Sequence, residues 1–170
     1  MSGKIFTSVI PLLALFPLTS SANSWVDVSN QYTNKQIQIT SQFQPEMASS
    51  IGITEADSLC SNITKAQQDK YIETLETSKK TLLQAVKTEK SLPVRQDLNI
   101  IIDNIDQTIA AGNLDDKYML PWVDVPLIIF RGVSALLDEQ MSDTRKQAAN
   151  TRLACYVGKT GQAALTEQAK

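Results

Sequence analysis

Two pairs of carboxylates have residue types and spacing that could support chemistry. Asp103 and Asp106 stand three positions apart, which places both on the polar face of a helix, and Asp115 directly precedes Asp116. Neighbouring carboxylates can act as a general acid and base, and their oxygens also bind hard cations. A solvated helix face and a solvated turn are the plainer interpretations of these pairs. We therefore assign no catalytic, cofactor-binding or metal-binding residue to this chain.

The chain of 170 residues contains no histidine, which restricts the chemistry that it can perform. This absence excludes Ser-His-Asp and Cys-His catalytic groups, a histidine general base and an HExxH zinc motif within the chain. Catalysis by carboxylates alone remains open. We expect no cofactor in this chain, and activity of the chain by itself is disfavoured.

The N-terminus has the pattern of a secretory signal. Lys4 is the only charged residue of this segment, and the apolar run Ile5–Leu18 follows it. Ser20 and Ala22 are small residues at the positions expected around a cut after Ala22. We expect residues 1–22 to be a cleaved signal peptide, which would export the protein to the periplasm or the extracellular space. A retained N-terminal anchor is the alternative.

Export would place Cys60 and Cys155 in an oxidising compartment, where two thiols often pair. A disulfide between them would close a loop of about 95 residues and contribute about 4–5 kcal/mol in the chain-entropy model. Two buried free thiols, which pack as small apolar side chains, are the alternative. Neither cysteine has CxxC spacing, so the sequence carries no redox or zinc motif of that type.

The net charge of -2 at pH 7 is mild and no basic block is present, so nucleic acid is not expected as a partner. Apolar residues recur at helical spacing over most of residues 23–170, which predicts an all-α fold in one domain. The pattern of residues 28–43 is mixed, and a helix is favoured because no neighbouring segment would pair with a lone strand. Pro45 is expected to begin a short helical turn, with Gly52 past its end.

Two long amphipathic helices are expected next, over residues 64–90 and 94–111. Thr64 and Gln67 have the spacing of a capping box at the start of the first helix. Gly112 is placed to end the second helix as a left-handed cap. The short Ser-Leu-Pro connection predicts an antiparallel hairpin. The apolar stripes of the two helices are formed by Ile72, Leu75, Leu82, Leu83 and Val86, and by Leu98, Ile101, Ile102, Ile105 and Ile109.

A last clear helical pattern covers residues 142–157, with Ser142 or Asp143 as its cap and Gly158 as its stop. The tail after Gly161 has the pattern of the start of another helix, and this pattern ends without a stop signal. We therefore expect an antiparallel helical bundle built from hairpins, which is the N-terminal part of a larger helical fold.

The most apolar run outside the N-terminus is Tyr118–Asp138. Asp124 is placed to cap a helix that is apolar around almost its whole circumference. A transmembrane span is disfavoured because this helix has only about 13 residues and carries Arg131. Core packing is favoured over a ligand-binding wall built from Trp122 and Phe130.

So broad an apolar face needs more partners than three amphipathic helices supply. We therefore expect part of the helix over residues 127–137 to stay under-covered in this chain alone, which favours a larger parent protein or an oligomer. Asn62 opens an Asn-Ile-Thr glycosylation sequon, for which turn or cap chemistry is the alternative.

Several segments, in order, resemble the N-terminal part of a bacterial protein family called domain of unknown function 885. The segments are FQPEMASSIGITEAD (Phe43–Asp57), the helix pair that follows, LPWVDVPLIIFRGVSALLD, and TRLACYVGKTGQAALTEQAK (Thr151–Lys170). In such proteins a proline-containing entry leads to a glycine and then an aspartate, and an Arg-Leu…Tyr…Gly run follows later. The matching residues here are Pro45, Gly52, Asp57, Arg152, Leu153, Tyr156 and Gly158.

The resemblance implies a largely helical, exported protein similar to zinc-dependent peptidases. Members are much longer, and their HExxPGH metal motif lies downstream of the region that this chain matches. No catalytic or metal residue can therefore be carried over to any position here, and zinc is implied only for full-length relatives.

Two functions follow as expectations. The first is the truncated N-terminal helical region of an exported zincin-like hydrolase, related to metallopeptidases and inactive alone. Its partner would be the missing C-terminal region or a second copy of the chain. The alternative is a small periplasmic helical module that binds a ligand or acts as an adaptor and folds by itself.

Overall fold

The computed structural model describes residues 22–120 and 122–169, so residues 1–21 of the expected signal peptide lie outside the described residues. Within the described part the chain is all-α, as predicted, and no strand is present there. The helices are α1 (Ala22–Phe43), α2 (Pro45–Ser50), the 3-10 turn η1 (Thr54–Ala56), α3 (Lys65–Thr88), α4 (Leu92–Tyr118), α5 (Val125–Leu137), α6 (Asp143–Tyr156) and α7 (Leu165–Gln168).

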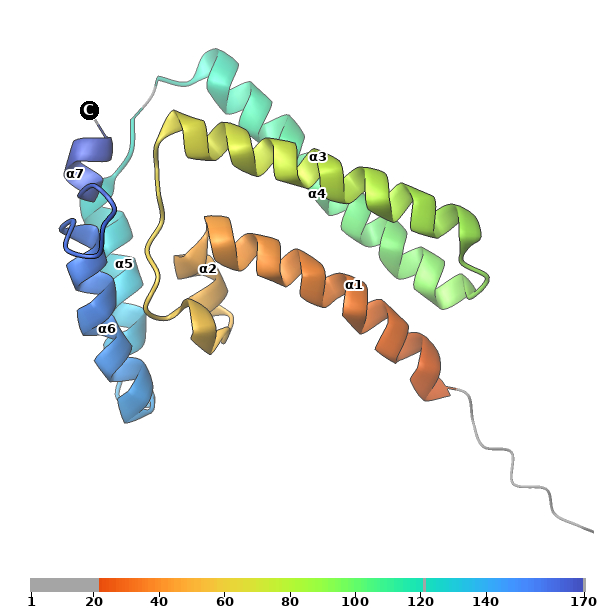
Figure 1. Cartoon of the computed structure of the whole chain (residues 1–170), viewed down its shortest axis with the longest axis horizontal. Helices are drawn as coiled ribbons and strands as arrows, with labels where there is room; N and C mark the ends of the chain where they lie inside the picture. The colour runs from red at the N-terminus through yellow and green to blue at the C-terminus, as the bar shows by residue number, and fades with distance from the viewer. Residues whose placement is uncertain (1–21, 121, 170) are drawn as a thin grey trace, which may run out of the picture.

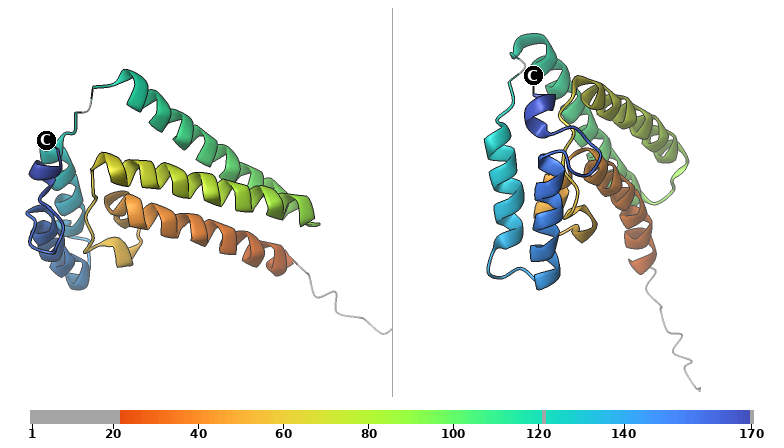
Figure 2. Two further views of the ribbon diagram at one scale, coloured as in Figure 1. Left: turned by 45° about the horizontal axis from the view of Figure 1, so that its top comes forward. Right: turned by 60° about the vertical axis from the view of Figure 1, so that its left-hand side comes forward.

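The three long helices lie side by side, and the short ones gather at one end of them (Figures 1 and 2). α3 and α4 form the predicted antiparallel hairpin, and α1 packs along both. α5 and α6 form a second hairpin that runs crosswise to the long helices, near the end of α1 and the start of α3 (Figure 1). α2 contacts both α1 and α5 and so joins the two parts.

Each part has its own hydrophobic core. The core of the long helices is formed by most of the predicted stripes, because Leu75 and Leu82 of α3 meet Leu98, Ile102 and Ile105 of α4 in the interior. Leu83 was predicted to belong to the α3 stripe, but it is 39% exposed and lies outside this core. The core of the second part gathers Val125, Tyr156 and Leu165, with Ile128, Ile129 and Val133 of α5 packed against them. Residues 57–64 lead from η1 to α3 and so connect the two parts.

One predicted helix end and one predicted capping interaction are wrong. α4 continues through Gly112 to Tyr118, and Gly112 instead makes room for α3, because a Cβ there would lie 3.1 Å from Ile72 Cδ1. The capping box at Thr64 is absent, since the Thr64 hydroxyl donates to Asn62 Oδ1 at 2.7 Å. The same Asn62 oxygen accepts from the Thr64 backbone N–H at 3.1 Å, which is the turn chemistry expected as the alternative to glycosylation.

Other predicted ends are confirmed. Asp124 caps α5, with its Oδ1 accepting from the Leu127 N–H at 2.9 Å. Ser142 precedes α6 as its cap residue. Gly52 and Gly158 follow α2 and α6 with φ of +98° and +81°, a left-handed backbone that glycine adopts at little cost.

The outer side of α5 is under-covered, as predicted. Leu127, Phe130 and Leu137 are 38%, 68% and 55% exposed, although Val125 and Leu136 on the other side of the helix are buried. Met119, Leu120 and Trp122 before α5 are exposed as well. Within the residues that the structure describes, no helix has the length and apolarity that crossing a membrane requires.

Candidate functional site

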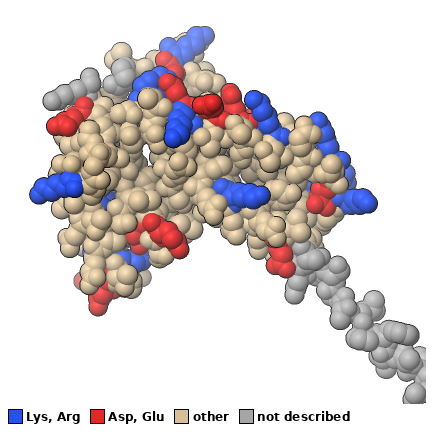
Figure 3. Space-filling view, viewed as in Figure 1, with Lys and Arg blue, Asp and Glu red and all other residues tan. Residues whose placement is uncertain are grey.

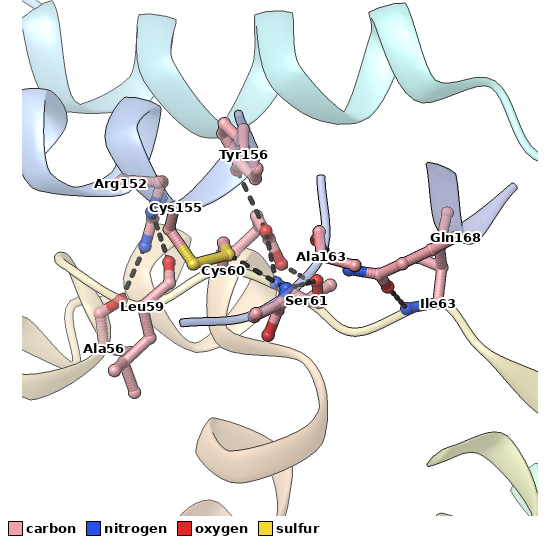
Figure 4. Close-up of a disulfide and its surroundings, with 12 residues drawn as sticks. Ala56, Leu59, Cys60, Ser61, Ile63, Arg152, Cys155, Tyr156, Ala163 and Gln168 are labelled. Carbon is pink, nitrogen blue, oxygen red and sulfur yellow. Dashed lines mark hydrogen bonds between the residues drawn. A yellow bond between two sulfur atoms is a disulfide. The ribbon is translucent and has the colours of Figure 1, made fainter. Parts of the chain in front are cut away.

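The polar residues of the second part form a junction that holds residues 46–63 against α5 and α6. Arg152 of α6 is completely buried at its centre. Its Nη1 donates to the Gly132 carbonyl of α5 at 2.8 Å. Its Nε and Nη2 donate to the carbonyls of Leu59 and Ala56, at 2.8 and 2.7 Å. One guanidinium thus ties α6 both to α5 and to the connecting segment, and Figure 4 shows its contacts with Ala56 and Leu59.

Asp57 and Arg145 form a second contact across the junction. Arg145 Nε and Nη2 donate to the two carboxylate oxygens at 2.7 and 2.8 Å, and the Ser49 hydroxyl donates to Asp57 Oδ1 at 2.6 Å. Burial acts to raise the pKa of the Asp57 carboxyl. Hydrogen bonds from Arg145 and Ser49, with the charges of Arg145 and Arg152, outweigh burial and hold this pKa below its ordinary value.

The depressed pKa of Asp57 predicts that the protein loses stability in acid. The carboxylate stabilises the fold above the ordinary aspartate pKa of 3.8, and this contribution is lost as the pH falls through the lower folded-state pKa. The variant Asp57→Asn lacks the titrating group. Urea denaturation should therefore show a large stability difference between wild type and variant near neutral pH, and a smaller one at about pH 3. A difference that does not change with pH would contradict this account.

Glu46 and Tyr156 form the third contact. The Tyr156 hydroxyl donates to Glu46 Oε1 at 2.9 Å, and the Ser61 backbone N–H donates to the same oxygen at 2.9 Å. The Ser61 hydroxyl donates to the other carboxylate oxygen. Burial raises the pKa of the Tyr156 phenol, and the negative charge of Glu46 raises it further. The phenol therefore stays protonated and acts as a hydrogen-bond donor rather than as a catalytic base.

Gly132 allows α5 and α6 to approach at this point. A Cβ at Gly132 would overlap the Tyr156 hydroxyl and lie 3.1 Å from Glu46 Cγ. We expect Gly132→Ala to destabilise the protein by about 1–3 kcal/mol, because the added methyl group displaces a buried hydrogen-bonded side chain. Thermal and urea unfolding of Gly132→Ala, beside Ser134→Ala on the exposed side of α5, measures this. Equal stability of the two variants would show that the close approach is unimportant.

A disulfide joins the two cysteines and fastens the same segment. Cys60 in the connecting segment is bonded to Cys155 of α6, with their Cα atoms 6.0 Å apart. Gln162 Nε2 donates to the Ser61 carbonyl at 2.9 Å, and the Ile63 N–H donates to Gln168 Oε1 at 2.8 Å. Residues 60–63 are thus attached to α6 through Cys60 and to α7 through Ile63 (Figure 4). The polar side chains of the junction form hydrogen bonds with one another and with the backbone. Their role is therefore to brace the fold.

A groove lies on the other side of this segment, between α3, α4 and residues 61–64, with a volume of about 600 Å³. Its polar lining is dominated by uncharged amides, from Gln44, Asn62, Gln67, Gln68, Asn104 and Gln107. An adjoining depression of about 640 Å³ shares Gln68 and Asp115 with the groove and adds Trp122 and Lys65. We call the second hollow the Trp122 depression. Together they form a hollowed surface whose glutamine side chains could contact a ligand.

The carboxylate pairs do not form a shared site. Asp106 pairs with Lys79, whereas Asp103 is exposed. Asp115 and Asp116 lie in the last turns of α4, not in a turn after it, because the helix continues past Gly112. Asp116 pairs with Lys65 at 2.5 Å, and Asp115 lines the groove. In residues 22–120 and 122–169, no group of three or more acidic or cysteine side chains is placed to hold a metal ion.

Reasoning from the sequence missed Arg145, Ser49 and Glu46 as members of the junction. A signal for the arginine was present, since Arg145 and Arg152 stand seven positions apart, and so share one face of α6 with Tyr156. Charged residues on a face that also carries a core tyrosine indicate buried, paired charges.

No protein-family model, no curated protein and no solved structure matches this chain.

Proposed function

We propose that this chain is a non-catalytic helical scaffold, the N-terminal helical region of an exported zincin-like hydrolase. The observation that carries the proposal is the apolar surface on the outer side of α5. Leu127, Phe130 and Leu137 are spaced three and seven positions apart, so they form one stripe along the helix. A contiguous exposed stripe of this kind is typical of a surface that another folded part covers.

The covering part in this proposal is the downstream region of the same hydrolase, which would supply the zinc motif. Three of the residues by which the chain resembles that family, Asp57, Arg152 and Tyr156, support this assignment because they brace the junction. Asp57 pairs with Arg145, and Arg152 binds three backbone carbonyls. Such residues keep α5 in position to present its apolar side, and they need no catalytic role of their own.

The Cys60–Cys155 bond supports an exported location. Disulfides persist in the periplasm and outside the cell, and they are rare where thiols are kept reduced. The proposal therefore places the scaffold in the periplasm or the extracellular space, in agreement with the signal-like pattern of residues 1–22.

The coding sequence directly downstream of this chain tests the proposal. We expect it to continue, in frame or after a frameshift, into a region that encodes an HExxPGH motif. Adding that polypeptide to this chain should then reduce binding of a hydrophobic dye to the outer side of α5. A downstream gene of unrelated sequence would contradict the proposal.

The groove favours a second candidate function, a small periplasmic binding or adaptor module. The side chains of Gln67, Gln68, Asn104 and Gln107 are the supporting observation, because their amides make no hydrogen bond with other described residues. A self-sufficient module should unfold cooperatively and sediment as one species without any partner. Circular dichroism melts and sedimentation of residues 23–170 measure both, and a molten or aggregated sample would exclude the module.

A further inference from the structure

We infer that the groove between α3 and α4 binds an uncharged oligosaccharide, which continues into the Trp122 depression and stacks there on the Trp122 indole. The two hollows adjoin, since both are lined by Ile63, Gln68, Asp115 and Val123. The inference concerns the groove and the Trp122 depression. It rests on the second candidate function, the binding module, and does not depend on the scaffold function.

The amide side chains of the groove are available to a ligand. Gln67 and Gln68 of α3 and Asn104 and Gln107 of α4 line it from two sides, and their amides make no hydrogen bond with other described residues. Gln68, Asn104 and Gln107 are exposed and Gln67 is half-buried, so these residues are open to solvent. A carboxamide offers a donor and an acceptor in one plane, which suits the neighbouring hydroxyls of a sugar.

The charges around the groove favour a neutral ligand. Asp115 is the only charged residue among those that line the groove, so a ligand with several charges would find no partners for them. Lys65 in the Trp122 depression is already engaged, at 2.5 Å from both Asp69 and Asp116. The Asp115 carboxylate can accept from two adjacent hydroxyls, which sugars carry and peptide backbones lack.

The aromatic residues favour a sugar over an extended peptide. Phe43 in the groove is only 7% exposed and packs on Tyr71 with ring centroids 5.0 Å apart. Its ring therefore belongs to the core and offers little surface to a ligand. Trp122 is 77% exposed and offers a broad apolar ring with a polar N–H. A pyranose ring presents flat C–H surfaces that pack against such a ring. On the face in Figure 3, an extended area without charged side chains separates groups of charges.

The site is also held in shape before any ligand arrives. Its rim, residues 61–64, is fastened by the Cys60–Cys155 bond and by the contact between Ile63 and Gln168. A fixed rim lowers the ordering cost of binding.

Titration calorimetry of the full chain, purified with the disulfide formed, tests the inference. The probes are maltohexaose, cellohexaose and chitohexaose in its N-acetylated form, with tryptophan emission recorded in parallel. We expect at least one of them to bind at submillimolar concentration and to shift the emission to the blue. Trp122→Ala should weaken its binding roughly tenfold, and Gln67→Ala combined with Gln107→Ala about three- to tenfold.

Trp25→Ala is the matched control, because Trp25 lies on α1 and does not line either hollow. It should leave the affinity unchanged, and melting curves should show all variants folded. Failure of all three hexasaccharides to bind folded protein would overturn the inference, as would equal weakening by Trp122→Ala and Trp25→Ala. Binding of a neutral octapeptide of alanine, glutamine and leucine, sensitive to the two glutamine substitutions, would reassign the groove to polypeptides and also overturn it.

Discussion

Replacing Arg152 with alanine is expected to lower the free energy of unfolding by about 3–5 kcal/mol. The guanidinium is completely buried and donates to the carbonyls of Ala56, Leu59 and Gly132. Without it, two buried acceptors and one partly buried acceptor lose their donor at about 1–3 kcal/mol each, and water entering the space would recover part of this cost. Single domains are stable by only about 5–15 kcal/mol, so the loss would remove a large share of the total.

Urea denaturation of Arg152→Ala beside Arg131→Ala measures the effect. Arg131 is an exposed arginine of α5, and its replacement should change stability by less than about 0.5 kcal/mol. If Arg152→Ala lost no more than Arg131→Ala, the buried guanidinium would not be the brace of the junction.

Removing the disulfide should have an effect of similar size. The bond joins residues 95 positions apart, and the chain-entropy model gives about 4–5 kcal/mol for a loop of that length. The variant with Cys60→Ser and Cys155→Ser should be destabilised to that extent. Hydrogen exchange should rise first in residues 60–64, because they lose their covalent attachment to α6, and in α7, because Gln168 accepts from the Ile63 N–H of that segment.

A reducing agent supplies the control for this prediction. It should destabilise the wild type to the level of the double serine variant and leave the variant itself unchanged. If the wild type were equally stable with and without reductant, the bond would contribute nothing to the fold.

Much of the fold could be predicted because the spacing of apolar residues indicates which side chains form the core. The stripe of Leu98, Ile102 and Ile105 has helical periodicity, and these side chains are buried as expected. The errors occurred where one residue type serves two purposes. Gly112 has the sequence signal of a helix cap, yet its missing side chain serves close packing against Ile72. Only the three-dimensional approach of α3 separates the two uses.

The junction was less predictable because its acceptors are mainly backbone carbonyls. Arg152 binds carbonyls of residues that lie 20 to 96 positions away, and a carbonyl carries no sequence signal. The sequence did not predict the groove, for a related reason. Its amides come from two helices, where each glutamine or asparagine alone has the pattern of an ordinary solvated face. The chain has only two cysteines, in contrast, so the one possible disulfide within the chain could be named from the sequence.

The central claim is that the outer side of α5 is a docking surface and not part of this chain's own core. The most direct test is the free energy of unfolding of the triple variant Leu127→Gln, Phe130→Gln and Leu137→Gln, beside Leu136→Gln on the buried side of the same helix. We predict that the triple variant stays within about 1 kcal/mol of wild type and binds less hydrophobic dye, whereas Leu136→Gln loses about 3 kcal/mol or more. A triple variant destabilised as strongly as Leu136→Gln would contradict the account.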